Sequence, residues 1–352
     1  MTITRAVILA GGLGSRLGPL TADRPAALLP VANRPIVEHL LDHLVRHRIR
    51  EATLALHHHP YPLEARLGDG TRWGMRLAYA LERVPLGTAG ATRRAAAGWT
   101  EPFLVASGTA LTTADVSKAA AFHPFGGAVL TLILGPADGA AGEIALDDDG
   151  RVDPLAPASD ARYRSTGLAI VSPEALAYVP PDGPSDLVAD LVPRLLAAGL
   201  GVAGYVAAEP GVLVRTPADL LAANRLGLAA ELPGLVLPGL EAQRGVRRSH
   251  GAFVHPQARV VPPAMIGANA VIGRGAVVED SVVGDDVIVS GWSVLRRSIV
   301  LSGTHVGRGL RVEEAVVDRD HLAPIGLDTW LRVEDPRILG DTRVPLRPHA
   351  GS

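Results

Sequence analysis

The chain lacks cysteine altogether and has a single lysine, Lys118. Without cysteine, neither a disulfide nor a thiolate-bound zinc ion is available to it. The other 33 of its 34 basic residues are arginine, which excludes any mechanism that needs a lysine at another position.

Long apolar runs are also missing. None approaches the ~20 residues that a membrane-spanning helix needs. Glycines and Arg16 interrupt the apolar stretch 7–20, so it does not have the pattern of a secretory signal. We therefore expect a cytoplasmic protein with no membrane partner.

Charge of one sign is not in excess, because 34 basic residues face 36 acidic ones and the formal net charge is −2. Such a chain has no positive field to attract nucleic acid, and we expect none as a partner. Hydrophobic residues make up 47% of the 352, which is ample for a core, and the length predicts about two domains.

The first part of the chain alternates buried strand-like runs with helical patterns. Strands are expected at 5–10, 52–56, 75–79, 103–106 and 128–134, and helices at 36–45, 63–67, 88–97, 115–122 and 217–228. Strands separated by helices predict a doubly wound, mostly parallel sheet. Asp149-Gly150 predicts a hairpin turn. We place the first domain at residues 1–228.

A different period begins after a Pro/Gly-bearing linker, residues 229–250. Aliphatic residues recur every six positions, with one five-residue step, at Val254, Val260, Ile266, Ile272, Val278, Val283, Val289, Leu295 and Leu301. This hexapeptide repeat predicts a left-handed parallel β-helix at residues 251–320, with the aliphatic side chains inside. Small residues after them (Gly267, Gly273, Gly284) are expected to permit its corners. Residues 321–352 are a tail without a clear pattern.

Residues 7–17 predict a strand that runs into a glycine-rich loop, Gly11-Gly12-Leu13-Gly14. Glycines let backbone N–H groups approach a phosphate closely, and Arg16 could pair with phosphate oxygens. By itself the loop is also explained by a tight strand-to-helix turn.

The loop opens a series of segments that resembles the sugar-1-phosphate nucleotidylyltransferases, and among them the GDP-mannose pyrophosphorylases. The segments are 9–17 (LAGGLGSRL), 19–21 (PLT), 24–25 (RP), 29–31 (LPV), 34–36 (RPI), 67–75 (LGDGTRWGM), 85–91 (PLGTAGA), 103–108 (FLVASG), 173–176 (PEAL), 190–193 (DLVP) and 216–219 (TPAD), with Gly167. The resemblance implies a Rossmann-like mixed sheet followed by a β-helix. It also implies a reaction in which a sugar 1-phosphate and a nucleoside triphosphate give a nucleotide-sugar and pyrophosphate, with Mg²⁺ as counter-charge.

The charged positions that the family uses for this reaction are altered. Ala26 stands where the family has the lysine of its opening signature, and Thr109 where it has a metal-binding aspartate. Pro157 and Ala158 replace a Glu-Lys pair, and Leu213 replaces the second aspartate. The resemblance therefore implies no secure metal site, and it predicts impaired catalysis with Arg16 as the remaining phosphate contact.

The positions that bind the nucleotide in the family are better retained in this sequence than those that bind the metal and the sugar phosphate. By the resemblance, the nucleotide-binding positions are Leu9, Gly11, Gly12, Gly14, Ser15, Arg16, Leu86, Gly87, Thr88 and Gly108, and the sugar-binding positions are Gly142 and Thr166. These residues could also persist only because the fold needs tight turns.

Three functions remain open. The first is a catalytically impaired subunit that binds a nucleoside triphosphate or nucleotide-sugar and regulates or assembles with an active paralogue. The second is an active nucleotidylyltransferase with a site rebuilt for an unusual sugar phosphate. The third is a structural protein that associates through its β-helix. Open ends of the β-helix predict an oligomer, either with itself or with a paralogue.

Overall fold

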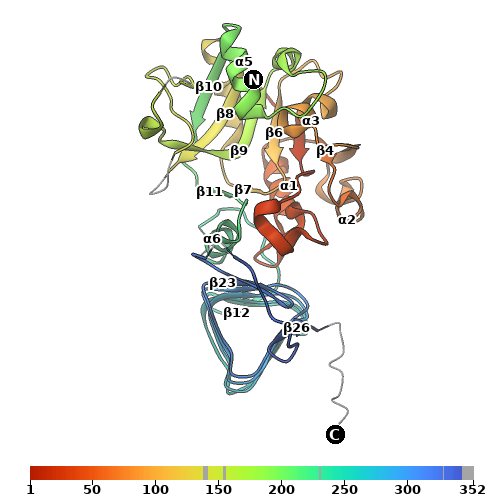
Figure 1. The fold of residues 1–352 in the computed structure, drawn as a ribbon, viewed down its shortest axis with the longest axis vertical. Coiled ribbons are helices and arrows are strands. Elements are labelled where there is room, and N and C mark those ends of the chain that lie inside the picture. The colour runs from red at the N-terminus through yellow and green to blue at the C-terminus, as the bar shows by residue number, and fades with distance from the viewer. Residues whose placement is uncertain (138–141, 154–155, 230, 328, 343–352) are drawn as a thin grey trace. The chain divides into compact units, whose positions relative to one another are not determined.

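The computed structural model describes residues 1–137, 142–153, 156–229, 231–327 and 329–342 (Figure 1). By their contacts these residues form two compact units. Unit 1 comprises Met1–Gly14, Asp23–Leu28 and Ile36–Leu213, and unit 2 comprises Ser15–Ala22, Leu29–Pro35 and Val214–Ser352. Within the described part of the chain, no helix is both long and apolar enough to span a membrane.

Unit 1 is built on a seven-stranded mixed sheet with the order β10-β8-β9-β6-β1-β4-β5. Its strands are β1 (Arg5–Leu9), β4 (Glu51–Leu56), β5 (Arg76–Leu81), β6 (Phe103–Ser107), β8 (Ala128–Pro136), β9 (Tyr163–Val171) and β10 (Gly201–Val206). All neighbours pair in parallel except β9, which is antiparallel to both β6 and β8. The predicted mixed α/β sheet is confirmed.

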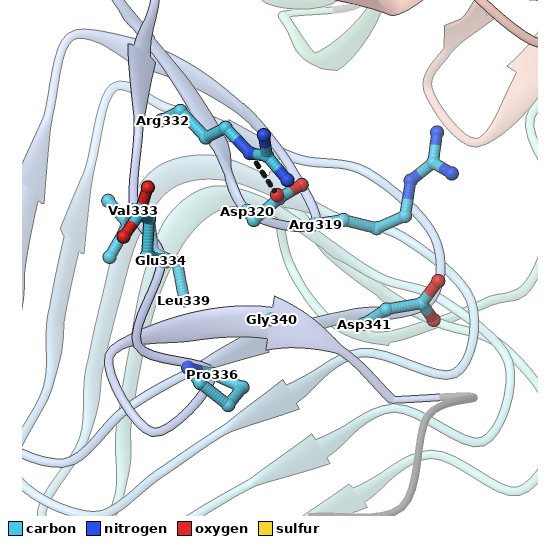
Figure 2. Close-up of a pocket in the computed structure, with 9 residues that line it drawn as sticks. All are labelled: Arg319, Asp320, Arg332, Val333, Glu334, Pro336, Leu339, Gly340 and Asp341. Carbon is cyan, nitrogen blue, oxygen red and sulfur yellow. Dashed lines mark hydrogen bonds and ion pairs between the residues drawn. The ribbon is translucent and has the colours of Figure 1, made fainter.

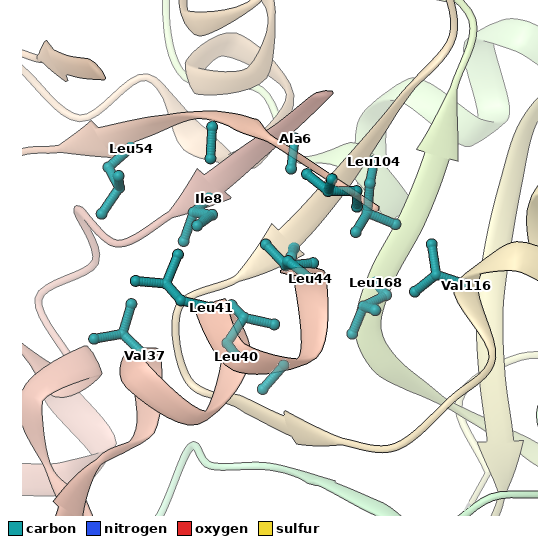
Figure 3. Close-up of a cluster of buried hydrophobic side chains, with 14 of the residues drawn as sticks. Ala6, Ile8, Val37, Leu40, Leu41, Leu44, Leu54, Leu104, Val116 and Leu168 are labelled. Carbon is teal, nitrogen blue, oxygen red and sulfur yellow. The ribbon is translucent and has the colours of Figure 1, made fainter. Parts of the chain in front are cut away.

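Both faces of this sheet are covered, because alternate residues of each buried strand point to opposite sides. On β1, Ile8 joins a cluster with Leu40, Leu44 and other side chains of helix α1 (Ile36–Arg46; Figure 3). Val7, the preceding residue, joins the opposite cluster with Ala91 of helix α3 (Gly87–Ala95). Continuous apolar strands such as RAVIL are thus explained by burial on two faces.

Four of the five helices described in unit 1 lie close to the ranges that the periodicity predicts. These four are α1 (Ile36–Arg46), α2 (Pro60–Leu67), α3 (Gly87–Ala95) and α4 (Val116–Phe122), and the fifth, α5 (Val192–Ala197), was not predicted. Asp115 caps α4 by accepting from the backbone N–H groups of Ser117 and Lys118. A two-stranded pairing of β7 (Ala110–Thr112) with β11 (Gly211–Leu213) completes the unit. The expected Asp149-Gly150 turn is present, since Leu146 and Val152 form an antiparallel bridge.

Unit 2 contains a coil of parallel strands whose inward residues stack in three columns. The columns are Val254-Ile272-Val289-Val306, Val260-Val278-Leu295-Val312 and Ile266-Val283-Val300-Val317. All belong to one apolar cluster or pack against it. The arrangement is consistent with the predicted β-helix, and Figure 1 shows its triangular outline. One position differs from the expected series: Val300, and not Leu301, is the partner of Val283, because a second five-residue step follows Leu295.

The strands of this unit are, in chain order, β2 (Pro30–Val31), β3 (Arg34–Pro35), β12 (Leu240–Gln243), β13 (Val246–Arg248), β14 (Phe253–Val254), β15 (Arg259–Ile266), β16 (Val271–Ile272), β17 (Val277–Val283), β18 (Ile288–Val289), β19 (Val294–Arg296), β20 (Ile299–Val300), β21 (Thr304–Val306), β22 (Arg311–Glu313), β23 (Ala315–Asp318), β24 (His321–Pro324), β25 (Leu331–Arg332) and β26 (Leu339–Asp341). Most of them have two to four residues, whereas β15 and β17 are longer and each contain residues of two inward columns; β2 and β3 form a separate pair.

The corners of the coil are not at the glycines that the sequence suggested. Residues with positive φ recur in three columns, Gly251-Asn269-Asp286-Gly303, Gly275-Trp292-Gly309 and Asp280-Arg297-Glu314. Gly267, Gly273 and Gly284 have ordinary φ angles. A Cβ on Gly273 would lie 2.7 Å from the backbone nitrogen of Gly291 in the next turn. These positions therefore require glycine because successive turns of the coil stack closely.

The predicted domain boundaries differ from the structure in three places. Helix α6 (Pro217–Leu228), expected to close the first domain, contacts β15, β17 and β23 of unit 2, and its Asn224 accepts from the Ala32 backbone N–H at 2.8 Å. Strands β12 and β13 occupy part of the expected linker. Strands β24, β25 and β26 occupy part of the expected tail.

The ends of the coil are also not simply open. On the first turn, β12 pairs antiparallel with β13. On the last turn, β24 pairs antiparallel with β23, and β26 pairs antiparallel with β21. These strands satisfy backbone groups that would otherwise form exposed edges. The oligomer stays a prediction, but exposed strand edges at these places are no longer a reason for it.

Candidate functional site

The glycine loop follows β1, and each glycine there has a different surrounding. A Cβ on Gly11 would lie 2.9 Å from the backbone nitrogen of His57, so packing against the end of β4 requires glycine. Gly14 has a φ of 65°, which favours glycine for conformational reasons. Gly12 has neither constraint, because a Cβ there would meet nothing within 4 Å. Gly12 is therefore the loop glycine that leaves open space beside the backbone.

Three segments of unit 1 meet where the loop begins. Gly108 donates its backbone N–H to the carbonyl of Leu9 at 2.8 Å. A Cβ on Gly108 would lie 3.1 Å from the Cβ of Ala10 and 3.2 Å from that of Ala27. The structure thus brings the predicted nucleotide-binding residues Leu9 and Gly108 together with the turn that contains Ala26. Ser15 and Arg16, which continue the loop, are exposed.

Two of the altered charged positions lie at one strand pair: Leu213 is the last residue of β11, and Thr109 directly precedes β7. Leu213 of β11 is the register partner of Ala110 of β7, which directly follows Thr109. The Thr109 hydroxyl lies 3.1 Å from the Ser107 hydroxyl. A Cβ on Gly167 would be 2.8 Å from Leu213 Cδ1, so the leucine fills the space beside β9.

This donor set does not fit Mg²⁺, which prefers carboxylate oxygens together with phosphates and water. It offers two neutral hydroxyls and a methyl group. Among the residues that the structure describes, no group of three or more histidine, cysteine, aspartate or glutamate side chains could hold a metal ion.

The N-terminus of α3, with Leu86, Gly87 and Thr88, is bonded to another part of unit 1. The Ser185 carbonyl accepts from the N–H groups of Ala89 at 2.8 Å and Gly90 at 3.3 Å. A Cβ on Gly87 would collide with that same carbonyl. These contacts give Gly87 a packing role in addition to the nucleotide role that the resemblance implies.

Thr88 is likewise engaged inside the protein. Its hydroxyl donates to Asp186 Oδ2 at 2.8 Å and accepts from the Leu187 backbone N–H at 2.7 Å. Both contacts join segments almost a hundred residues apart in the chain. A ligand that used this hydroxyl would have to compete with them.

Glu82 is a residue of this region that sequence analysis missed. Its carboxylate accepts from the Leu86 backbone N–H at 3.2 Å, and its carbonyl lies 3.0 Å from His57 Nδ1. Burial raises the pKa of the Glu82 carboxyl against the opposing effect of the Leu86 N–H. Glu82 therefore connects the segment 86–88 with His57, against which Gly11 packs. No local pattern in the sequence marks it.

The predicted sugar-binding residues have structural partners as well. Thr166 donates its hydroxyl to the Ile133 carbonyl at 2.6 Å, and a Cβ on Gly142 would collide with the Ala161 carbonyl. Pro157 and Ala158, at the lost Glu-Lys pair, are exposed and lie just before Ala161. Residue 155 of the same segment lies outside the described residues.

A separate hollow of 460 Å³ lies in unit 2, near the C-terminal end of the coil (Figure 2). Arg319 and Arg332 line it together with the acidic Asp320, Glu334 and Asp341. Arg332 Nε bonds Asp320 Oδ2 at 3.0 Å. Because its charges offset one another, this hollow does not favour a polyanion such as a nucleotide.

Comparison with known proteins agrees with the arrangement of the two parts of the chain. A family model described as nucleotidyl transferase matches residues 5–206, and one described as GMPPB C-terminal domain matches residues 245–344. The chain is 30% identical over 266 residues to a mannose-1-phosphate guanylyltransferase of Mycobacterium tuberculosis, a match that covers 73% of each protein. It is 28% identical over 263 residues to a UTP–glucose-1-phosphate uridylyltransferase of Synechocystis sp., covering 69% of this chain and 68% of the relative.

A solved structure shares the fold. HddC from Yersinia pseudotuberculosis, complexed with GMP-PN, superimposes with a TM-score of 0.55 at 20% identity. The match covers 63% of this chain and 98% of HddC.

Proposed function

Because this chain belongs to the sugar-1-phosphate nucleotidyltransferase family, we propose that it binds a nucleotide or nucleotide-sugar of the GDP-mannose type while its own nucleotidyl transfer is impaired. The observation that carries the proposal is the pairing of β7 with β11. It places Leu213 beside the residue that follows Thr109, where the family resemblance assigns two metal-binding aspartates. A leucine and a threonine cannot replace two carboxylates as metal ligands.

Retention of binding is supported by the glycine loop. Gly12 leaves open space next to the backbone, and Arg16 is exposed two residues after Gly14. Phosphate recognition by backbone N–H groups does not need the missing lysine and aspartate side chains. Binding can therefore persist without the metal that the family reaction uses, and we expect it to be independent of Mg²⁺.

A binding protein without turnover would act through another protein. We propose that it forms an oligomer, with itself or with an active paralogue, and reports nucleotide-sugar occupancy to that partner. All of the predicted nucleotide-binding residues except Ser15 and Arg16 belong to unit 1. Most of unit 2 therefore has no assigned part in nucleotide binding, and we propose that it contacts the partner.

The binding proposal is tested by removing one arginine. Arg16→Ala is expected to weaken binding of GTP by about tenfold to a hundredfold, because a charge-assisted hydrogen bond to phosphate is lost. Isothermal titration calorimetry with GTP and with GDP-mannose measures this. Arg259→Ala, which removes an exposed arginine from β15, is the matched control and should leave the affinity unchanged. Equal affinities for the two variants, or no binding by the wild type, would contradict the proposal.

A further inference from the structure

Trp330, far along the chain from the glycine loop, lies directly against Gly18. A Cβ on Gly18 would be 2.5 Å from Trp330 Nε1 and 2.8 Å from its Cδ1, so no larger residue fits there while the indole stays in place. Gly18 has φ 55° and ψ −132°, a conformation that itself favours glycine. Both residues belong to unit 2.

The indole is fixed to the coil by the strands around it. Trp330 immediately precedes β25, which pairs with β24, and β24 pairs with β23 of the last turn. Asp320 contacts residues of both strands: its Oδ2 accepts from Arg332 Nε at 3.0 Å (Figure 2). Its Oδ1 lies 2.9 Å from His321 Nδ1. The His321 ring packs against Trp330 at a steep angle of 70°, with centroids 6.5 Å apart.

Gly18 forms the kink between two short 3₁₀ turns of the segment Ser15–Thr21, which continues the glycine loop. The segment is anchored by the buried side chains of Leu17 and Leu20, and Thr21 donates its hydroxyl to the Gly18 carbonyl at 3.2 Å. Its first two residues, Ser15 and Arg16, are exposed. A shift of Gly18 would therefore be passed to Arg16, two residues away.

We propose that Trp330 is a positioning residue for Arg16: within unit 2 it fixes the segment Ser15–Thr21, which carries this predicted phosphate contact. This inference rests on the proposed function, since it concerns the same phosphate contact. It assigns a role to the C-terminal strands, for which the sequence offered none. In this proposal, loss of the indole acts through the order and position of the segment that bears Arg16, because Trp330 packs on Gly18 of that segment.

Trp330→Ala tests the inference. We expect it to weaken GTP binding by about fivefold to tenfold and to speed amide hydrogen exchange in residues 15–21. Trp330→Phe, which keeps an aromatic ring, should restore part of both. Trp292→Ala is the matched control, because Trp292 also packs on a glycine with positive φ, Gly275, in the same unit but in the corner of a coil turn. It should change neither readout.

The pair of glycines gives a second test of the same contact. Gly18→Ala should reproduce the effect of Trp330→Ala on GTP binding, whereas Gly275→Ala should not. If the wild type binds GTP and Trp330→Ala binds it equally well, this inference fails while the proposed function stands. If exchange in residues 15–21 rises equally in Trp292→Ala, the effect is general loosening and the inference also fails. If the wild type binds neither GTP nor GDP-mannose, both the proposed function and the inference fail.

Discussion

Pyrophosphate release from GTP and mannose 1-phosphate is expected to be at least about a thousandfold slower with this protein than with the M. tuberculosis guanylyltransferase under the same conditions. Transfer between two polyanions depends on positive charge that offsets phosphate repulsion. By the resemblance, lysines at the positions of Ala26 and Ala158 supply part of this charge, and aspartates at the positions of Thr109 and Leu213 hold the metal that supplies the rest. The glutamate of the Glu-Lys pair is also absent, at Pro157. A coupled pyrophosphate assay with Mg²⁺, run across several nucleotides and sugar phosphates, measures the rate.

Restoring the two carboxylates should recover binding of the metal before it recovers turnover. In the double variant Thr109→Asp with Leu213→Asp, we expect nucleotide affinity to become dependent on Mg²⁺. The strand pairing of β7 with β11 would bring the two new side chains close together. The control is Thr109→Asn with Leu213→Asn, which has the same shape without charge and should gain no Mg²⁺ dependence.

Two results would count against this account. Robust turnover by the wild type with any substrate pair would reject impaired catalysis and favour a site rebuilt for an unusual sugar phosphate. A double aspartate variant that folds but gains no Mg²⁺ dependence would show that Thr109 and Leu213 are not the metal positions.

Acidification should destabilise the protein strongly between pH 6.5 and about pH 4, through two buried histidines. His123 is 2% exposed, and burial lowers its pKa from 6.5 to about 4. His43 is also 2% exposed, and burial, with the nearby His47 and Arg46, lowers its pKa to about 4. Both are neutral in the folded protein over this range.

The direction follows from proton binding. Below pH 6.5 the unfolded chain takes up protons at these positions that the folded protein does not take up until about pH 4. The contribution of these two histidines to the free energy of unfolding is therefore fully present above pH 6.5, and it is lost as the pH falls toward 4. The loss is on the order of 1.4 kcal/mol per pH unit for each histidine.

Urea unfolding at pH 7, 6 and 5 measures this effect. The His123 ring contacts the hydroxyls of Thr131 at 2.8 Å and Ser172 at 2.9 Å, so His123→Asn should be less stable at pH 7 yet lose less stability on acidification. His250→Asn, at an exposed histidine, should follow the wild type throughout. An unchanged pH dependence in His123→Asn would rule out this histidine as a source of the effect.

Local patterns predicted five of the seven strands of the sheet and four of the five helices described in unit 1, because the periodic spacing of buried residues along a strand or helix can be read from neighbouring positions. Strands β9 and β10 and helix α5 were not predicted. Helix α6 has the predicted bounds, and the inward residues of the coil follow the hexapeptide spacing up to Leu295. The antiparallel direction of β9 was not predictable in this way, since it depends on strand order across the whole sheet. The same holds for the packing of α6 on unit 2.

The candidate site was predictable only in part, for a similar reason. Spacing along the chain indicated the glycine loop and, by resemblance, the altered positions Thr109 and Leu213. It could not indicate that Ser185 bonds the start of α3, that Thr88 contacts Asp186, or that Trp330 packs on Gly18. Each of these contacts joins residues that are distant in sequence, and no sequence motif indicates that the two partners meet.

The antiparallel strands on the terminal turns of the coil limit end-to-end extension of the coil by further copies. A parallel coil is a template for its own elongation, because each turn exposes the hydrogen-bonding groups that the next turn uses. Here β12 covers one side of the first turn, and β24 and β26 cover two sides of the last, with the opposite strand direction. A second copy cannot continue the parallel ladder on these sides. These strands therefore oppose extension of the coil into a filament by addition of further copies at its ends.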